Sequence, residues 1–305
     1  MKSLIKNILA VAAMTVAPAL NGFAQTRSVE HDLSPFEGIE ASGGFKVKIV
    51  QSDSYTAKIT VDDALESYVQ CYVKAGVLHV GLDDKSVPKD LKKQYKGKNA
   101  AEPTLIATVS MPILNSMTLN DDSEFYNTGN LTAENFTLIL NGSTGITNLK
   151  IVAKTANLTV NKNAKLSNLN VTTEGDITLN GDGKGTVTME CTAENLYVNS
   201  AGNCDLTVNG PVEKKVVVTT SGSGKTSVSG TAGSLEVNGS KGGSSKVEAT
   251  ALKVDTATVS LTGGTAEVAP AKNLELDLGK GAEVDYAGDP VIKIVKIQSA
   301  TVLRK

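Results

Sequence analysis

Apolar and polar residues alternate with a period of two through the first part of the chain. Segments 45–49, 69–73 and 105–109 each place an apolar side chain at every second position. Such alternation is typical of β-strands that bury one face. We therefore predict a strand-rich region over residues 25–117.

The alternation stops between residues 83 and 103. Tyr95 lies in this segment together with six lysines, Lys85, Lys89, Lys92, Lys93, Lys96 and Lys98. A charged segment without an apolar pattern is typical of a solvated loop, so we predict an exposed loop over 83–103. A docking site for anionic glycans or lipid headgroups is the alternative interpretation.

From residue 118 to residue 290 the pattern repeats. In most repeats an apolar residue is followed by Asn or another small turn residue, with an average spacing of about 20 residues. The pairs are Leu119-Asn120, Leu140-Asn141, Val160-Asn161, Leu179-Asn180, Val198-Asn199, Thr220-Ser221, Val237-Asn238, Leu261-Thr262 and Leu278-Gly279. A fixed period of this length indicates a solenoid.

The repeat region lacks the 3.6-residue apolar period of a helix that could cover a sheet. The apolar faces must then be buried by winding, so that each coil bonds to the coils above and below it. We predict an all-β fold, a right-handed parallel β-helix over 118–290 with about 20 residues per coil. Residues 25–117 would cap one end and 291–305 would supply a cap strand at the other, because an open solenoid end exposes unpaired backbone.

The recurring asparagines have a structural explanation. Asn tolerates the left-handed backbone of turns, and stacked amides bond to one another. We predict one ladder of Asn120, Asn141, Asn161, Asn180 and Asn199. The alternative is a sugar-binding strip, and the same two interpretations apply to the outward threonines Thr118, Thr137, Thr159, Thr178 and Thr207, which are good strand formers.

The first 24 residues have the features of a secretory signal. Lys2 and Lys6 precede an apolar stretch over 8–20, and small residues precede Gln25. Pro18 interrupts the apolar stretch, which is too short to anchor the chain in a membrane. We predict cleavage after Ala24 and an exported protein, located in the periplasm, at the cell surface or outside the cell, without a membrane span in the mature chain.

Composition limits the partners and the chemistry. The formal net charge is −2, Trp is absent and aromatic residues make up 4% of the chain. Because lysines and acids are interspersed, nucleic acid is excluded as a partner. The odd number of cysteines and the absence of a clustered ligand set indicate that Cys71, Cys191 and Cys204 are small buried apolar side chains.

Acidic residues are the first candidates for catalysis or calcium binding. Asp121, Asp122 and Glu124 share one turn, and Asp176 and Asp182 lie near another. A β-helix hydrolase needs two carboxylates at a defined separation, whereas acids in turns commonly serve as turn formers. Calcium would need more oxygen ligands than this turn supplies.

The other catalytic residue types are outside the repeats. Arg27, Arg304, His31 and His79 all lie outside the coils, so neither an arginine base nor a serine–histidine pair is available there. Segment 222–226 lacks the upstream spacing of a phosphate loop and is followed by a strand pattern. Tyr126 and Tyr197 are not one period apart and form no sugar platform. We therefore expect no catalytic, metal or cofactor-binding residue and no cofactor.

Several segments carry a resemblance to a known family. They are 36–39, 44–49, 77–80, 111–115 and 286–291, with Gly/Ser-rich turns between the last two. In this order they resemble the auto-transporter adhesin, head GIN domain family, found largely in exported proteins of Bacteroidetes-type bacteria. The resemblance implies a β-helix and a role in adhesion.

Two functions follow as hypotheses. The first is a non-catalytic, exported, adhesin-like or cell-envelope module that presents the flank of the β-helix to a glycan or a protein. The alternative is a polysaccharide-active enzyme that resembles the pectin-lyase-like β-helix proteins, a hypothesis that rests on fold analogy. We also consider a homo-oligomer, because an open solenoid end favours edge-to-edge assembly.

Overall fold

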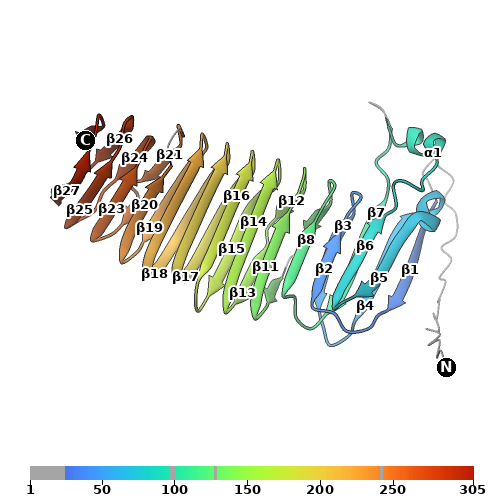
Figure 1. The fold of residues 1–305 in the computed structure, drawn as a ribbon. Helices are drawn as coiled ribbons and strands as arrows, with labels where there is room; N and C mark the ends of the chain where they lie inside the picture. Colours follow the sequence, from blue (N-terminus) through green and yellow to red (C-terminus); the bar gives the residue numbers. More distant parts are fainter. Residues whose placement is uncertain (1–24, 97–99, 127–128, 241–242) are drawn as a thin grey trace, which may run out of the picture.

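The chain is a β-solenoid of about nine turns with roughly 20 residues each (Figure 1). The computed structural model describes residues 25–305 except 97–99, 127–128 and 241–242, so the predicted signal peptide lies outside the described residues. Strands make up 65% of the described residues and helices 4%. The predicted all-β parallel β-helix and its period are confirmed, and the right hand of the coil stays a prediction.

Two long sheets run along the rod, and we name them sheet A and sheet B. Sheet B contains, in spatial order, β5 (Val69–Lys74), β6 (Val77–Leu82), β2 (Gly38–Ala41), β8 (Ser116–Leu119), β11 (Asn135–Leu140), β14 (Thr155–Lys162), β16 (Ile177–Gly183), the second halves of β17 (Thr186–Gly202) and β18 (Asp205–Gly222), β20 (Ser234–Gly239), β23 (Thr256–Leu261), β25 (Asn273–Leu278) and β27 (Val291–Ile297). From β6 to β27 all neighbours in this sheet are parallel.

Sheet A forms the opposite side of each coil. It contains, in spatial order, β1 (Thr26–Asp32), β4 (Thr56–Asp62), β7 (Leu105–Met111), β3 (Lys46–Gln51), β9 (Glu124–Tyr126), β12 (Gly145–Thr147), β15 (Lys165–Thr173), the first halves of β17 and β18, β19 (Lys225–Thr231), β21 (Lys246–Ala249), β24 (Gly264–Val268), β26 (Ala282–Tyr286) and β28 (Thr301–Arg304). Short strands continue this sheet around a corner, namely β10 (Asn130–Thr132), β13 (Lys150–Ala153) and β22 (Leu252–Lys253).

Apolar side chains stack in columns inside the coils. One column of sheet B consists of Leu138, Leu158, Leu179, Val198, Val218, Val237, Val259 and Leu276, which are in register from strand to strand and are all fully buried. Alternation with a period of two sends these side chains inward and their neighbours outward. The apolar pattern that predicted half-buried strands is therefore the pattern that builds the core.

The strand register differs from the repeat that the spacing of the apolar–Asn pairs predicts. Leu179 pairs with Leu158, and the partner of Val160 is Gly181. The next inward position is filled by Ser200, Thr220 and Gly239 in successive coils. Because these residues are small or polar, the apolar marker of the repeat falls two positions earlier in three coils, at Leu179, Val198 and Val237.

The N-terminal end is closed by antiparallel strands. β4 pairs antiparallel with β7, β1 with β4, and β5 with β6. The 3-10 helix η1 (Asp63–Tyr68) adds the buried side chain of Leu65. β2 and β3, which precede these strands in the sequence, already pair in parallel with β8 and β9. The solenoid thus begins inside the region that we expected to be only a cap.

Segments 83–103 and 291–305 both differ from their predictions. The 83–103 segment is not simply an exposed loop, because α1 (Lys89–Gln94) forms within it and Val87 is buried. Leu91 and Tyr95 also pack against the core, while Lys98 lies outside the described residues. The tail over 291–305 forms two strands, β27 and β28, which pair in parallel with β25 and β26 and add a coil.

Candidate functional site

The five predicted asparagines form two ladders instead of one. Asn161 donates from Nδ2 to Oδ1 of Asn141 at 2.9 Å, and Asn141 donates to Oδ1 of Asn120 at 2.8 Å. Asn199 donates to Asn180 at 2.9 Å, but Asn180 donates to Asn157 at 3.2 Å. The ladder therefore breaks between Asn161 and Asn180.

The break follows from the register of β14 and β16. Asn180 is level with Thr159, and Asn161 is level with Asp182. Asn180 and Asn199 thus belong to a row of outward side chains two residues before the turn. We name this the outer row, and it consists of Asn180, Asn199, Thr219, Asn238, Ser260 and Asp277. The turn row consists of Asn161, Asp182, Ala201, Ser221, Ser240 and Thr262.

A groove runs between the outer row and the turn row. One part, of about 320 Å³, lies over the ends of β14, β16, β17 and β18. A second part, of about 390 Å³, lies over β18, β20, β23 and β25. Both parts are lined by Thr219 and Ser221, so they are contiguous. We call the whole the polar groove, and with strands about 4.8 Å apart it extends roughly 29 Å along the rod.

Small inward residues give the polar groove its floor. Gly181, Ser200, Thr220 and Gly239 lie between the two rows. These side chains point into the coil or are absent, so the floor seen from outside is backbone. The side chains of the two rows are two residues apart on each strand, about 6.8 Å, and form the walls.

The lining offers hydrogen bonds and little charge. Its walls present amides and hydroxyls, with carboxylates at Asp182 and Asp277. Asn199 and Thr219 are exposed, while Asn180, Asn238 and Ser260 are half-buried. Amide groups both donate and accept, and hydroxyls do the same. The groove can therefore bind a neutral, extended molecule rich in polar groups.

The predicted acidic residues do not form a paired site. Asp121 and Asp122 have positive φ of 51° and 61°, which identifies them as turn formers. Asp176 precedes β16 and accepts a hydrogen bond from Asn195 at 2.8 Å, whereas Asp182 lies near the other end of β16 in the turn row. Six residues of extended strand separate them by about 20 Å, beyond the carboxylate separations that glycosidases use, about 5–9.5 Å.

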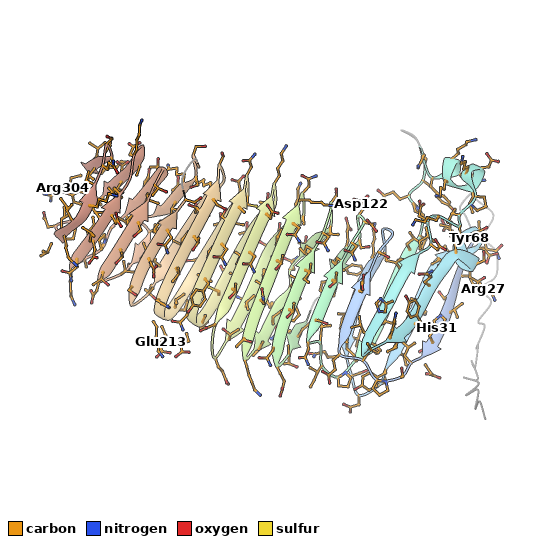
Figure 2. All side chains as sticks on the ribbon, in the orientation of Figure 1. Arg27, His31, Tyr68, Asp122, Glu213 and Arg304 are labelled. Atoms are coloured by element: carbon orange, nitrogen blue, oxygen red, sulfur yellow. The ribbon has the colours of Figure 1, made fainter. Side chains whose placement is uncertain are left out.

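The arginine and histidine side chains lie toward the ends of the rod. Arg27 and His31 are at the N-terminal end and Arg304 is at the other end (Figure 2). Partial burial lowers the pKa of His31. His79 stacks on Tyr72 with ring centroids 5.0 Å apart and lies 3.3 Å from Glu40 through Nδ1. None of these four groups lines the polar groove.

The two coil tyrosines are on different sheets. Tyr126 is 42% exposed on β9 of sheet A. Tyr197 is half-buried on sheet B, where Nζ of Lys215 lies 5.2 Å from the ring centroid. They form no common platform, as the spacing predicts.

The cysteines differ in burial. Cys191 and Cys204 are buried, as predicted, and burial raises the pKa of the Cys191 thiol to about 12. Cys71 is only half-buried on the edge strand β5, which corrects its prediction, and its pKa is raised to about 11. Within the described ranges, no group of three His, Cys, Asp or Glu side chains could hold a metal ion.

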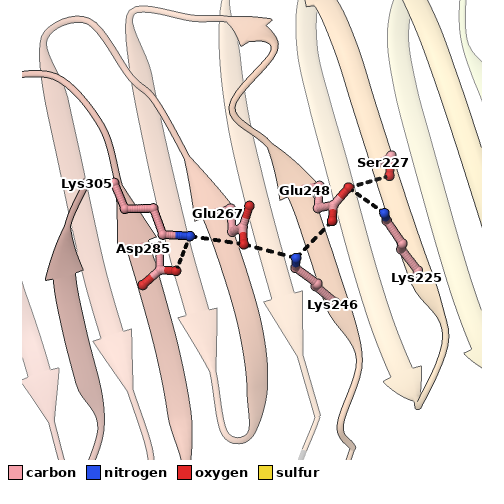
Figure 3. Close-up of polar contacts among 7 residues, drawn as sticks. All are labelled: Lys225, Ser227, Lys246, Glu248, Glu267, Asp285 and Lys305. Atoms are coloured by element: carbon pink, nitrogen blue, oxygen red, sulfur yellow. Dashed lines mark hydrogen bonds and ion pairs between the residues drawn. The ribbon is translucent and has the colours of Figure 1, made fainter.

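A ladder of ion pairs crosses the last coils of sheet A (Figure 3). Glu248 accepts from Lys225 at 2.7 Å and from Lys246 at 2.9 Å, and Lys246 reaches Glu267 at 3.0 Å. Lys305 continues the ladder to Glu267 and Asp285. This ladder was not predicted from the sequence. Its signal is the coil period, since Lys225 and Lys246 are 21 residues apart and Glu248 and Glu267 are 19 residues apart.

Segment 222–226, which superficially resembles a phosphate loop, leads into the strand β19 as predicted. Its Lys225 belongs to the ion-pair ladder. A phosphate loop needs a helix N-terminus directly after it, so this segment has no such function.

Comparisons with known proteins place the chain among adhesin-named relatives. The family model described as "Putative auto-transporter adhesin, head GIN domain" matches residues 35–210 and 154–290. Among curated proteins, none matches the chain.

Several solved structures are similar to the chain over most of its length. A "putative adhesin" from Parabacteroides distasonis is 20% identical, with 93% of this chain and 98% of that chain covered and a TM-score of 0.46. A "putative lipid binding protein" from the same organism is 19% identical, with the same coverage and a TM-score of 0.43. A "putative adhesin" from Parabacteroides merdae is 17% identical over 93% and 98%, with a TM-score of 0.39.

Helices of the length and apolarity needed to cross a bilayer do not occur among the residues that the structure describes.

Proposed function

Because the chain belongs to the auto-transporter adhesin, head GIN domain family, we propose that it is an exported, non-catalytic binding module that holds a glycan strand in the polar groove. The groove is the observation that carries this proposal. It is long and open along its length, and its lining comes from seven consecutive strands of sheet B, six of which contribute amides or hydroxyls.

Glycan chains match the chemistry of the two rows. Sugar hydroxyls donate and accept hydrogen bonds, and so do the amide groups of Asn199 and Asn238 and the hydroxyls of Thr219 and Ser260. A neutral polymer needs no basic side chain to neutralise it, and the groove lining contains no Lys or Arg among the described residues. Repeated coils offer repeated contacts, so weak single sites add up along a polymer.

The separation of the carboxylates supports binding over catalysis. Asp182 and Asp277 lie at opposite ends of the groove, in the strands β16 and β25. Five strand spacings separate those strands, about 24 Å. A hydrolase that resembled the pectin-lyase-like proteins would need a second carboxyl group near one of them.

The test compares two arginine variants of the same strand. Thr219 and Thr207 are both exposed on β18, but Thr219 lines both parts of the groove and Thr207 is on sheet A, outside it. Thr219→Arg would put a long side chain across the groove. Thr207→Arg adds the same charge and bulk elsewhere, and is the matched control.

Both variants and the unchanged protein would be applied to a glycan array, with the bound glycan then titrated by calorimetry. We expect Thr219→Arg to weaken binding by at least about tenfold, roughly 1.4 kcal/mol, and Thr207→Arg to bind normally. Equal binding by all three proteins would refute the groove as the site. Release of reducing ends from the bound polysaccharide would refute the non-catalytic assignment.

A further inference from the structure

β27 and β28 form the coil at the C-terminal end of the solenoid (Figure 1). This coil exposes a cluster of apolar side chains. In the described part of the chain, eleven large apolar side chains are exposed, and six of them belong to this coil. They are Val291 (71%), Ile292 (38%), Ile294 (60%), Val295 (55%), Ile297 (41%) and Leu303 (50%).

Part of this cluster is the inner face of the coil. Ile292 and Ile294 are in register with Leu274 and Leu276, which are fully buried on β25. Val302 is likewise in register with the buried Val284. The inward columns of the core thus continue into this coil, where nothing covers their last members. The inward part of the exposed surface is therefore a cross-section of the hydrophobic core, whereas Val291 and Leu303 lie on the outward side of their strands.

The same coil presents two open strand edges. Within the described residues, β27 pairs only with β25, and β28 pairs only with β26. The outer edge of each strand therefore offers unpaired N–H and C=O groups. A partner that covers the whole surface must supply two strand edges, one for each sheet, with an apolar face between them. A second copy of this coil has these three features in the required arrangement.

We propose that the β27–β28 coil is a self-association surface on which a second copy of the chain docks tail to tail. A two-fold axis perpendicular to the rod would pair β27 with the same strand of the second copy and β28 likewise. Because the two-fold axis reverses strand direction, both pairings would be antiparallel, which is a favourable strand arrangement. The interface would be isologous and closed, so association would stop at the dimer.

The N-terminal end does not match this surface. Its core is closed, with Leu65 and Phe36 buried. Its edge strand β1 carries charged side chains at Arg27, Glu30 and Asp32. Covering the apolar coil with this end would bury those charges against apolar side chains, which is costly. Tail-to-tail docking is therefore favoured over a head-to-tail filament.

Three of the four cationic side chains in segment 291–305 form ion pairs within one chain. Lys293 lies 2.9 Å from Glu275, Lys305 lies 2.7 Å from Asp285, and Arg304 pairs with Asp289. Two such ends can approach without strong repulsion between their cations. An apolar patch on the order of 500 Å² on each copy would bury on the order of 1,000 Å² in the dimer, which is the size of a weak, reversible interface.

The test measures mass and shape of the chain from residue 25 onward as its concentration rises from micromolar to submillimolar. Light scattering gives the mass and small-angle X-ray scattering gives the maximum dimension. We expect a monomer–dimer equilibrium, with a dimer about twice as long as the monomer. Ile294→Lys and Ile297→Lys, which change inward residues in register with the buried Leu276 and Leu278, should each abolish the dimer. Val152→Lys, at a residue 47% exposed on β13 and away from the ends, is the control and should dimerise normally.

Three results would overturn the proposal. The unchanged chain could remain monomeric at every concentration, it could form polymers of increasing length, or it could form a dimer that both lysine variants retain. Circular dichroism of each variant confirms that its fold is intact, and because Ile294 and Ile297 are exposed, we expect these variants to fold. The result is independent of glycan binding, since the polar groove lies on the flank of the rod.

Discussion

Glu248 is the central residue of the ion-pair ladder. Hydrogen bonds from Lys225 and Lys246 hold its pKa at about 2, below the ordinary value of 4.5. A depressed pKa means that the ionised carboxylate is more stable in the folded state than in the unfolded state. The resulting stabilisation is complete above about pH 4.5 and is lost as the pH falls toward 2.

Glu248→Gln should therefore lower the thermal midpoint at pH 7, by about 2–4 °C. Because protonation removes the same charge from the unchanged protein, the difference in midpoint should shrink below pH 4.5, be small at pH 2 and vanish only at lower pH. Thermal unfolding followed by circular dichroism across this range measures it. Glu236→Gln is the control, since Glu236 is exposed and bonds the amide of Asn238. A difference that is the same at pH 2 and pH 7 would contradict the assignment.

Gly210 is the glycine whose replacement we expect to cost most. Its φ is +148°, and a Cβ at this position would overlap the carbonyl oxygen of Cys191 in the neighbouring coil. Gly210→Ala should therefore destabilise the protein by on the order of 3 kcal/mol. Gly145→Ala is the control, because a Cβ there would meet no atom within 4 Å. Urea unfolding measures both, and equal effects would refute the steric explanation.

Among the elements, the ladder of Asn120, Asn141 and Asn161 can be tested at its middle member. Asn141 donates to Asn120 and accepts from Asn161, so it links three coils. Asn141→Ala removes both hydrogen bonds and should lower the free energy of unfolding by about 1–2 kcal/mol. Thr172→Ala, at an exposed position of β15, should change it little. Chemical unfolding compares the two, and equal losses would show that the ladder adds no stability.

The strands and their period could be predicted from alternation, because burial on one face leaves a direct trace in the sequence. The division of the asparagines into two ladders could not be predicted in this way. The inward position after Val160 is filled by Gly181, Ser200 and Thr220 in the next coils, so the apolar marker disappears where the register is set. The polar groove was missed for the same reason, since its floor consists of these small residues and its two rows become neighbours only after winding.

The whole molecule is asymmetric between its ends. Antiparallel strands, η1 and α1 close the N-terminal end, whereas the β27–β28 coil is exposed. The sequence predicted a cap at each end, and only the first contains side chains that cover the core. The β27 pattern of alternating apolar residues is that of an inner coil, so alternation alone does not distinguish a covered coil from an open one.

This asymmetry predicts a gradient of backbone protection. In dilute solution, amides of β27 and β28 should exchange with solvent fastest among the strands, because they pair on one side only and few buried contacts hold them. Amides of β16, β17 and β18, in the middle of the rod, should exchange slowest. Hydrogen exchange followed by mass spectrometry measures the order. Equal protection along the rod in dilute solution would contradict it.

The stacking of coils also determines how the rod responds to tension. The interstrand hydrogen bonds of both sheets point along the rod, so a pull between its ends loads them lengthwise, one layer of coil against the next. Detaching a coil of about 20 residues would release roughly 65 Å of extended chain. A force–extension trace should then show a series of evenly spaced drops. A rod built in this way lengthens stepwise under load while the remaining coils stay folded.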